Sequence, residues 1–78
     1  MSQIDEEKLR HAVLTALRLP GERYRPDLKL GDLEEWDSLG HLELIAQIEA
    51  TFGVRFEFDH IPELDSLAAI RARLRDLL

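Results

Sequence analysis

The sequence Glu34-Glu35-Trp36-Asp37-Ser38-Leu39-Gly40-His41 opens the segment around which the rest of the chain is organised. Asp37 can act as the N-cap of a helix that we expect to run from Ser38 to about Phe52, because its carboxylate can accept a backbone N–H of the first turn. A helix start leaves N–H groups unpaired and carries partial positive charge. The Ser38 hydroxyl therefore stands where an attached phosphate ester would be electrostatically favoured.

This expected helix has two apolar faces, because successive side chains are separated by about 100°. One face can pack against a core and holds Leu44, Ile45, Ile48 and Phe52. The roughly opposite face holds Leu39, Leu42 and Ala46, flanked by Glu43 and Glu49. Exposed apolar residues rimmed by charge often mark a surface that contacts a partner.

The composition is that of one small globular domain. The chain has 78 residues, 45% of them hydrophobic, and no cysteine, which excludes disulfides, thiol nucleophiles and thiolate metal sites. The net charge is −6, and residues 31–50 hold six acids and no lysine or arginine. Such a field disfavours nucleic acid and anionic membranes and favours partners with basic patches. An acidic surface that only maintains solubility is an equally good explanation of the charge by itself.

The N-terminal segment Met1–Glu7 has neither the basic nor the apolar region of a signal peptide, and no stretch is long enough to span a membrane. We therefore expect a soluble, cytoplasmic protein. The three histidines, His11, His41 and His60, do not have the spacing of a metal site, so we predict no specific metal.

The first helix is expected from about Asp5 to Arg18, capped by Asp5 and stopped by Pro20-Gly21. Its core-facing residues should be Leu9, Val13, Ala16 and Leu17, with Ala12 and Leu14 at the margins. A long connection follows from about Leu19 to Trp36, in which residues 32–36 could form one helical turn. The apolar residues expected to anchor this connection are Leu28, Leu30, Leu33 and Trp36.

After the central helix, Gly53 should act as the C-terminal stop. Residues 54–58 alternate apolar and charged, but no second strand exists to pair with them, so we expect an extended connector that buries Val54 and Phe56, with Phe58 as a further candidate. A short helix should cover residues 60–64. A final helix should be capped by Asp65 and bury Leu67, Ile70, Leu74 and Leu77. The fold class is all-α, a small four-helix bundle of three main helices plus one short helix, with a long first loop.

These residues also carry a family resemblance. Asp37-Ser38-Leu39, the following Leu42-Glu43-Leu44 and the terminal Phe52-Gly53 resemble an acyl carrier protein, and the similarity in length, acidity and helix order extends over nearly the whole chain. The resemblance implies a single acyl-carrier-type domain over residues 1–78. It also implies that Ser38 is the attachment point of 4′-phosphopantetheine, transferred from coenzyme A by a phosphopantetheinyl transferase.

The resemblance further implies a non-catalytic, freestanding and monomeric carrier that holds acyl or aminoacyl groups as thioesters. Its other partners would be an acyl or aminoacyl ligase or transferase and downstream acyl-processing enzymes with basic patches. The residues expected to contact partners are Asp37, Leu39, Leu42, Glu43, Ala46 and Glu49. The residues that could line a space for the cargo are Leu44, Ile48, Phe52, Ile61 and Leu64.

Two departures from the family pattern weaken an assignment to general fatty-acid synthesis. Gly40 stands directly after the Asp-Ser-Leu triplet, where the family often has an acid, and Ala50 stands where a second acid often follows the one at Glu49. The helix is therefore less acidic than in fatty-acid synthesis carriers, which favours a specialised biosynthetic pathway. The kind of pathway (fatty acid, polyketide, lipid modification or aminoacyl) stays open from the sequence.

Two other functional classes remain open from the sequence. The first is a plain acidic helical interaction module, in which Ser38 is only a capping residue. The second is a hydrolase that uses His41 as a base for Ser38, but the chain lacks the G-x-S-x-G turn and enough length to enclose a substrate. We expect His41 to lie on the core side of the helix and Trp36 to anchor the loop.

Overall fold

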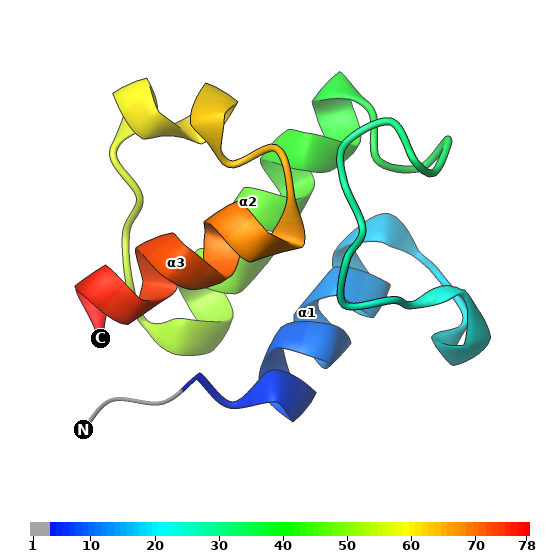
Figure 1. The fold of residues 1–78 in the computed structure, drawn as a ribbon, viewed down its shortest axis with the longest axis horizontal. Coiled ribbons are helices and arrows are strands. Elements are labelled where there is room, and N and C mark those ends of the chain that lie inside the picture. Colours follow the sequence, from blue (N-terminus) through cyan, green and yellow to red (C-terminus); the bar gives the residue numbers. More distant parts are fainter. Residues whose placement is uncertain (1–3) are drawn as a thin grey trace.

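The computed structural model describes residues 4–78 and contains helices joined by loops (Figure 1). The elements are α1 (Glu6–Leu17), the 3₁₀ helix η1 (Gly21–Arg23), α2 (Ser38–Phe52), the 3₁₀ helix η2 (Phe58–Glu63) and α3 (Leu67–Leu77). Residues 1–3, which belong to the N-terminal segment where no signal peptide was expected, lie outside the described residues. Within residues 4–78 the only β-type pairing is an isolated bridge between Lys29 and Ser66. The expected all-α fold with three main helices is confirmed, and a second short helix, η1, lies in the first connection in addition to the one that was expected.

Helix α1 begins as expected and ends earlier than expected. The Asp5 carboxylate accepts the backbone N–H groups of Glu7 and Lys8 at 3.1 and 3.3 Å. The helix ends at Leu17 because Arg18 takes the left-handed conformation, with φ 57° and ψ 48°. The prediction that Pro20-Gly21 ends the helix was therefore wrong, and so was the prediction that Arg18 lies in its last turn. The core-facing residues are also shifted, since Ala12 is fully buried and Ala16 only partly.

Helix α2 has the bounds and both ends that its sequence predicts. Asp37 Oδ1 accepts the Gly40 N–H at 2.8 Å, which confirms Asp37 as the N-cap. Gly53 has φ 67° and its N–H bonds the Glu49 carbonyl, a left-handed C-terminal stop that favours glycine. Both ends are fixed by residues adjacent to the helix.

The connection from α1 to α2 is anchored by Leu28 and Trp36, which are fully buried, and by Leu33, which is partly buried. The expectation for Leu30 was wrong, since 43% of it is exposed. Its backbone N–H bonds the Asp65 carbonyl at 2.8 Å, next to the Lys29–Ser66 bridge, so the backbone rather than the side chain holds this position. Residues 32–36 form no helical turn; a bond from the Trp36 N–H to the Leu33 carbonyl closes a simple turn.

The connection from α2 to α3 buries Phe56 and partly buries Val54, as expected. Phe58 is 84% exposed, so its proposed burial was wrong. The short helix starts at Phe58, two residues before its expected start, and is a 3₁₀ helix with Pro62 inside it. The segment lies on the opposite side of the helices from the long first connection (Figure 1).

Helix α3 is capped by Ser66, not by Asp65. Ser66 Oγ accepts the Ala69 N–H at 3.0 Å, whereas the Asp65 carbonyl accepts the Leu30 N–H. The backbone pairing of this segment with the first connection leaves the capping position to the serine. Leu67, Ile70 and Leu74 are buried as expected, but Leu77 at the open end of the helix is 40% exposed.

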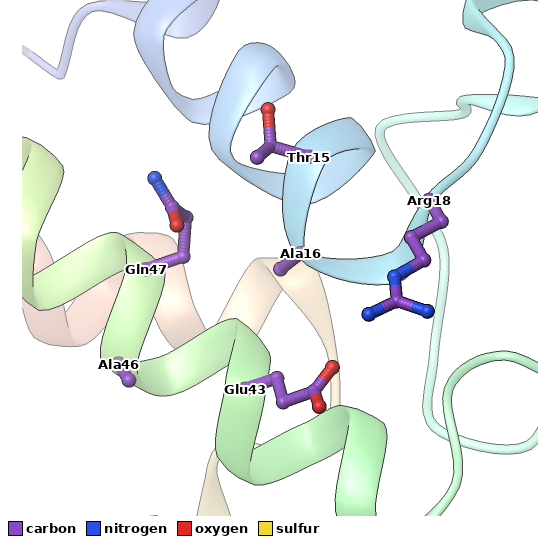
Figure 2. A pocket seen from close by; sticks show the side chains of 6 residues that line it. All are labelled: Thr15, Ala16, Arg18, Glu43, Ala46 and Gln47. Atoms are coloured by element: carbon purple, nitrogen blue, oxygen red, sulfur yellow. The ribbon is translucent and has the colours of Figure 1, made fainter.

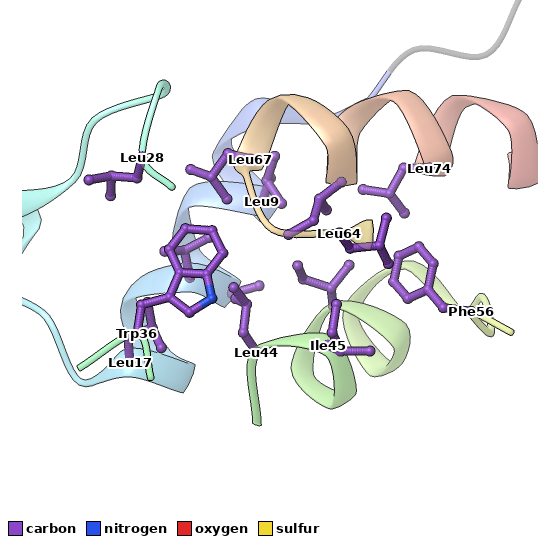
Figure 3. Close-up of a cluster of buried hydrophobic side chains, with 14 of the residues drawn as sticks. Leu9, Leu17, Leu28, Trp36, Leu44, Ile45, Phe56, Leu64, Leu67 and Leu74 are labelled. Carbon is purple, nitrogen blue, oxygen red and sulfur yellow. The ribbon is translucent and has the colours of Figure 1, made fainter. Parts of the chain in front are cut away.

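One core joins the elements, with Trp36 among leucines of α1, α2, α3 and the first connection (Figure 3). Arg71 of α3 links the outer layer: its side chain donates to the Glu6 carboxylate, the Pro26 carbonyl and the Tyr24 hydroxyl. Across residues 4–78, none of the helices has the length and apolarity needed to cross a membrane.

Candidate functional site

Ser38 is the first residue of α2 and is exposed. Asp37 satisfies one N–H of the first turn, that of Gly40, and the start of the helix carries the positive end of the helix dipole. Because Ser38 is exposed, a phosphate ester on its hydroxyl would be accessible and would be stabilised by the helix start. The residues present fit a serine-linked phosphodiester.

Gly40 allows the preceding loop to lie directly over the first turn of α2. A Cβ atom at Gly40 would overlap the carbonyl oxygen of Glu35, because the two atoms would be closer than non-bonded atoms approach each other. An acid at this position, the family's frequent choice, would displace the Glu35 backbone. The departure from the family pattern thus has a steric reason in the path of the loop before Ser38.

His41 lies on the core side of α2, as expected, with only 8% of it exposed. Its Nδ1 accepts a hydrogen bond from Trp36 Nε1 at 3.0 Å, and its Nε2 lies 3.0 Å from the Ile61 carbonyl oxygen. Both ring nitrogens are therefore occupied by groups other than Ser38. This arrangement disfavours a role for His41 as the base of a serine hydrolase.

The outer face of α2 presents the expected apolar strip. Leu39 and Leu42 are 66% and 54% exposed, and Ala46 and Glu43 are exposed beside them. Glu49 differs from the other acids, because one of its carboxylate oxygens accepts the Phe56 N–H at 2.7 Å. The structure thus brings Leu39, Leu42, Glu43 and Ala46 together next to Ser38, whereas Glu49 also holds the following loop.

A groove between α1 and α2 borders this strip (Figure 2). Its lining residues are Thr15, Ala16, Arg18, Glu43, Ala46 and Gln47, and a neighbouring hollow shares Arg18 and Glu43 and reaches Asp37, Leu39 and Gly40. Figure 2 shows the Arg18 side chain extending from the end of α1 toward α2. Arg18 was not expected at the site, because α1 was predicted to continue through this residue.

The residues expected to line a cargo space divide into two sets. Leu44, Ile48 and Leu64 are buried in the packed core. Phe52 and Ile61 are partly buried, and Ile61 borders an open hollow with Glu49, Phe56 and Phe58. The exposed Phe58 was missed as a candidate surface residue because its alternating pattern suggested burial.

The charges before Ser38 are partly paired. Arg23 Nη1 and Glu35 Oε2 are 2.8 Å apart, and both side chains remain substantially exposed. Two hydrogen bonds lower the pKa of the Glu35 carboxyl: the one from its own backbone amide has the larger effect, and the one from Arg23 the smaller. Among residues 4–78, no cluster of three or more histidines and carboxylates could hold a metal ion.

Comparison with known families gives one match that covers most of the chain. The family model described as "Phosphopantetheine attachment site" matches residues 7–74. Comparisons with curated proteins and with solved structures give no significant match.

Proposed function

Because the chain belongs to the phosphopantetheine attachment-site family, we propose that Ser38 is the residue to which its 4′-phosphopantetheine is attached. Proteins of this family are carriers that hold this group covalently. The observation that supports Ser38 most directly is its exposed position as the first residue of α2, immediately after the capping Asp37. Residues 1–78 would then act as one carrier domain.

The attached group supplies a terminal thiol, which holds an acyl or aminoacyl cargo as a thioester. The chain's own residues stabilise and position the point of attachment. The start of α2 stabilises the phosphodiester by its unpaired N–H groups, and Asp37 fixes the first turn. The protein needs no catalytic base for this role, which agrees with the engagement of both nitrogens of His41 inside the fold.

The partner surface that we propose consists of Asp37, Leu39, Leu42, Glu43, Ala46 and Glu49. Leu39 and Leu42 would supply apolar contact, and Glu43 would pair with a basic residue of the partner. Charge complementarity at such an exposed surface mainly raises association rates and specificity, which suits a carrier that binds several enzymes briefly. Glu49 would contribute less, because one of its oxygens is already bound by Phe56.

The proposed partners are a phosphopantetheinyl transferase, an acyl or aminoacyl ligase or transferase, and later acyl-processing enzymes with basic patches. A specialised biosynthetic pathway fits better than general fatty-acid synthesis, because Gly40 and Ala50 replace two frequent acids on α2. For a long cargo, Phe52 and Ile61 are the accessible candidates, whereas Leu44, Ile48 and Leu64 would have to move out of the packed core.

The test is the intact mass after incubation with coenzyme A and a broad-specificity phosphopantetheinyl transferase. The wild type should gain one phosphopantetheine unit, and Ser38→Ala should gain none while keeping its helical circular dichroism. Absence of a gain with several transferases would favour the alternative of an acidic interaction module. Such a module would also bind its partner unchanged after Ser38→Ala.

A further inference from the structure

The side chain of His41 joins three separate segments of the chain. Trp36 of the first connection donates to its Nδ1, and the Ile61 carbonyl of η2 lies 3.0 Å from its Nε2. An indole N–H can only donate, so Nδ1 must be the unprotonated, accepting nitrogen. The neutral ring then carries its proton on Nε2, which donates to the Ile61 carbonyl. Trp36 thus selects the tautomer that allows α2 to hold η2.

Helix geometry places one contact between α2 and η2 close to Ser38. His41, whose Nε2 meets the Ile61 carbonyl, follows Ser38 by three residues, which is less than one turn or about 4.5 Å along the helix axis. Glu49 lies within about 20° of Ser38 on the same face of α2, about 16 Å farther along the axis. Glu49 borders a hollow with Phe58 and Ile61 of η2. An enzyme that reaches Ser38 and extends along this face of α2 would therefore also contact η2, in which the Phe58 ring is exposed.

We propose that His41 is a positioning residue for the modification of Ser38. It does not touch the reacting hydroxyl; it fixes η2 against α2 through the Ile61 carbonyl, so that both segments are presented to the phosphopantetheinyl transferase in one arrangement. The inference rests on the proposed attachment at Ser38 and extends it to a residue that the carrier role by itself does not use.

The polar character of position 41 supports this role. An apolar side chain could fill the same buried space, but it would leave the Trp36 N–H without its partner and would leave the Ile61 carbonyl with the Leu64 N–H alone. Unpaired buried polar groups are costly, so a hydrogen-bonded histidine specifies one arrangement of the three segments. Among the described residues, the ion pairs of η2 are formed by His60. Its ring nitrogens lie 4.0 Å from a carboxylate oxygen of Glu57, just before η2, and 3.9 Å from one of Glu63, within η2. Those contacts hold η2 to itself rather than to α2.

Two substitutions separate the two hydrogen bonds of His41. In His41→Gln the longer side chain can place an amide N–H near the Nε2 position and keep the bond to Ile61. In His41→Asn the shorter side chain can place its amide oxygen near the Nδ1 position and keep only the bond from Trp36. Each variant loses one hydrogen bond, but His41→Gln leaves the Trp36 N–H unpaired, whereas the Ile61 carbonyl keeps the Leu64 N–H in His41→Asn. The free energy of unfolding should therefore fall at least as much in His41→Gln as in His41→Asn.

The measurement is the steady-state kinetics of Ser38 modification, with each protein as the varied substrate of one phosphopantetheinyl transferase. We expect His41→Asn to raise KM by about 3- to 10-fold, and His41→Gln to stay within about twofold of the wild type, because one hydrogen bond changes an equilibrium by roughly this factor. The exposed His11→Asn is the matched control and should not change KM. All variants are assayed at a temperature at which circular dichroism shows them folded.

Equal values of KM in His41→Asn and His41→Gln would overturn the positioning role, because a merely structural histidine predicts an effect that follows stability. A second measurement does not depend on the variants: nitrogen chemical shifts of His41 in the wild type should show the Nε2–H tautomer, and the Nδ1–H tautomer would contradict the proposal. A wild type that several transferases fail to modify would instead contradict the attachment at Ser38, and with it the process that His41 is proposed to assist.

Discussion

Trp36 Nε1 donates a hydrogen bond of 3.0 Å to His41 Nδ1, and the two rings lie 22° from parallel with their centroids 6.2 Å apart. The pair connects the end of the long first connection to the first turns of α2. Trp36 is fully buried, so it anchors the loop both by apolar burial and by its single polar atom. Ser38 lies between these two residues in the sequence, so the hydrogen bond between them fixes the chain before and after Ser38.

Trp36→Phe should therefore destabilise the protein by about 2–4 kcal/mol. The change leaves the buried Nδ1 of His41 without its donor, at about 1–3 kcal/mol, and creates a cavity where the larger ring was. Chemical denaturation followed by circular dichroism measures the free energy of unfolding. An unchanged unfolding midpoint would show that the hydrogen bond and the indole volume are dispensable.

Gly40→Ala should also destabilise the protein, by about 1–3 kcal/mol, although alanine ordinarily favours a helix over glycine by about 1 kcal/mol. The sign is reversed because the new Cβ would overlap the Glu35 carbonyl oxygen. Gly21→Ala is the matched control, since its nearest neighbour is the flexible end of the Arg10 side chain. Stabilisation by Gly40→Ala in a denaturation experiment would mean that the loop does not lie over this turn.

The features of α2 were predictable because they are local. Asp37 and Gly53 adjoin the helix and specify its ends by their own hydrogen bonds and backbone preference. The cap of α3 was not predictable in this way, because Asp65 and Ser66 are both good capping residues. The choice depends on the bond between the Asp65 carbonyl and Leu30, which is 35 residues away in the sequence.

The features of the candidate site also divide into those set by local sequence, which were predictable, and those set by contacts between distant residues, which were not. The exposed strip of Leu39, Leu42 and Ala46 follows from helical periodicity and was found in the sequence. The burial of His41 was also expected from its place on the helix. The contact between His41 and the Ile61 carbonyl joins residues that are 20 positions apart, and no sequence pattern in either segment predicts it. The exposure of Phe58 likewise depends on how η2 packs.

Arg71→Met should raise the pKa of Tyr24 further and destabilise the protein by about 1–3 kcal/mol through the loss of its bonds to Glu6 and Pro26. Burial already raises the pKa of Tyr24, and the charge of Arg71 opposes this effect. Since the folded pKa is the higher one, the stability contributed by neutral Tyr24 is complete below the unfolded value of about 10 and is lost as the pH rises through the folded pKa.

Ultraviolet absorbance can follow this titration directly, because Tyr24 is the only tyrosine of the chain. Arg71→Lys is the control, since it keeps the positive charge but loses the planar set of donors. A Tyr24 pKa that does not change in Arg71→Met would contradict the electrostatic contact with Arg71.

Arg18→Gly should stabilise the protein by about 1 kcal/mol, because Arg18 is the only residue other than glycine with positive φ in residues 4–78. Arg18→Ala is the matched control: it removes the same charge but keeps the backbone strain, so it should leave the free energy of unfolding almost unchanged. Equal stability of the two variants would contradict the left-handed end of α1. Because Arg18 also lines the groove beside Glu43, a more stable Arg18→Gly protein that reacts more slowly with a partner enzyme would indicate that this residue is retained for recognition at the expense of stability.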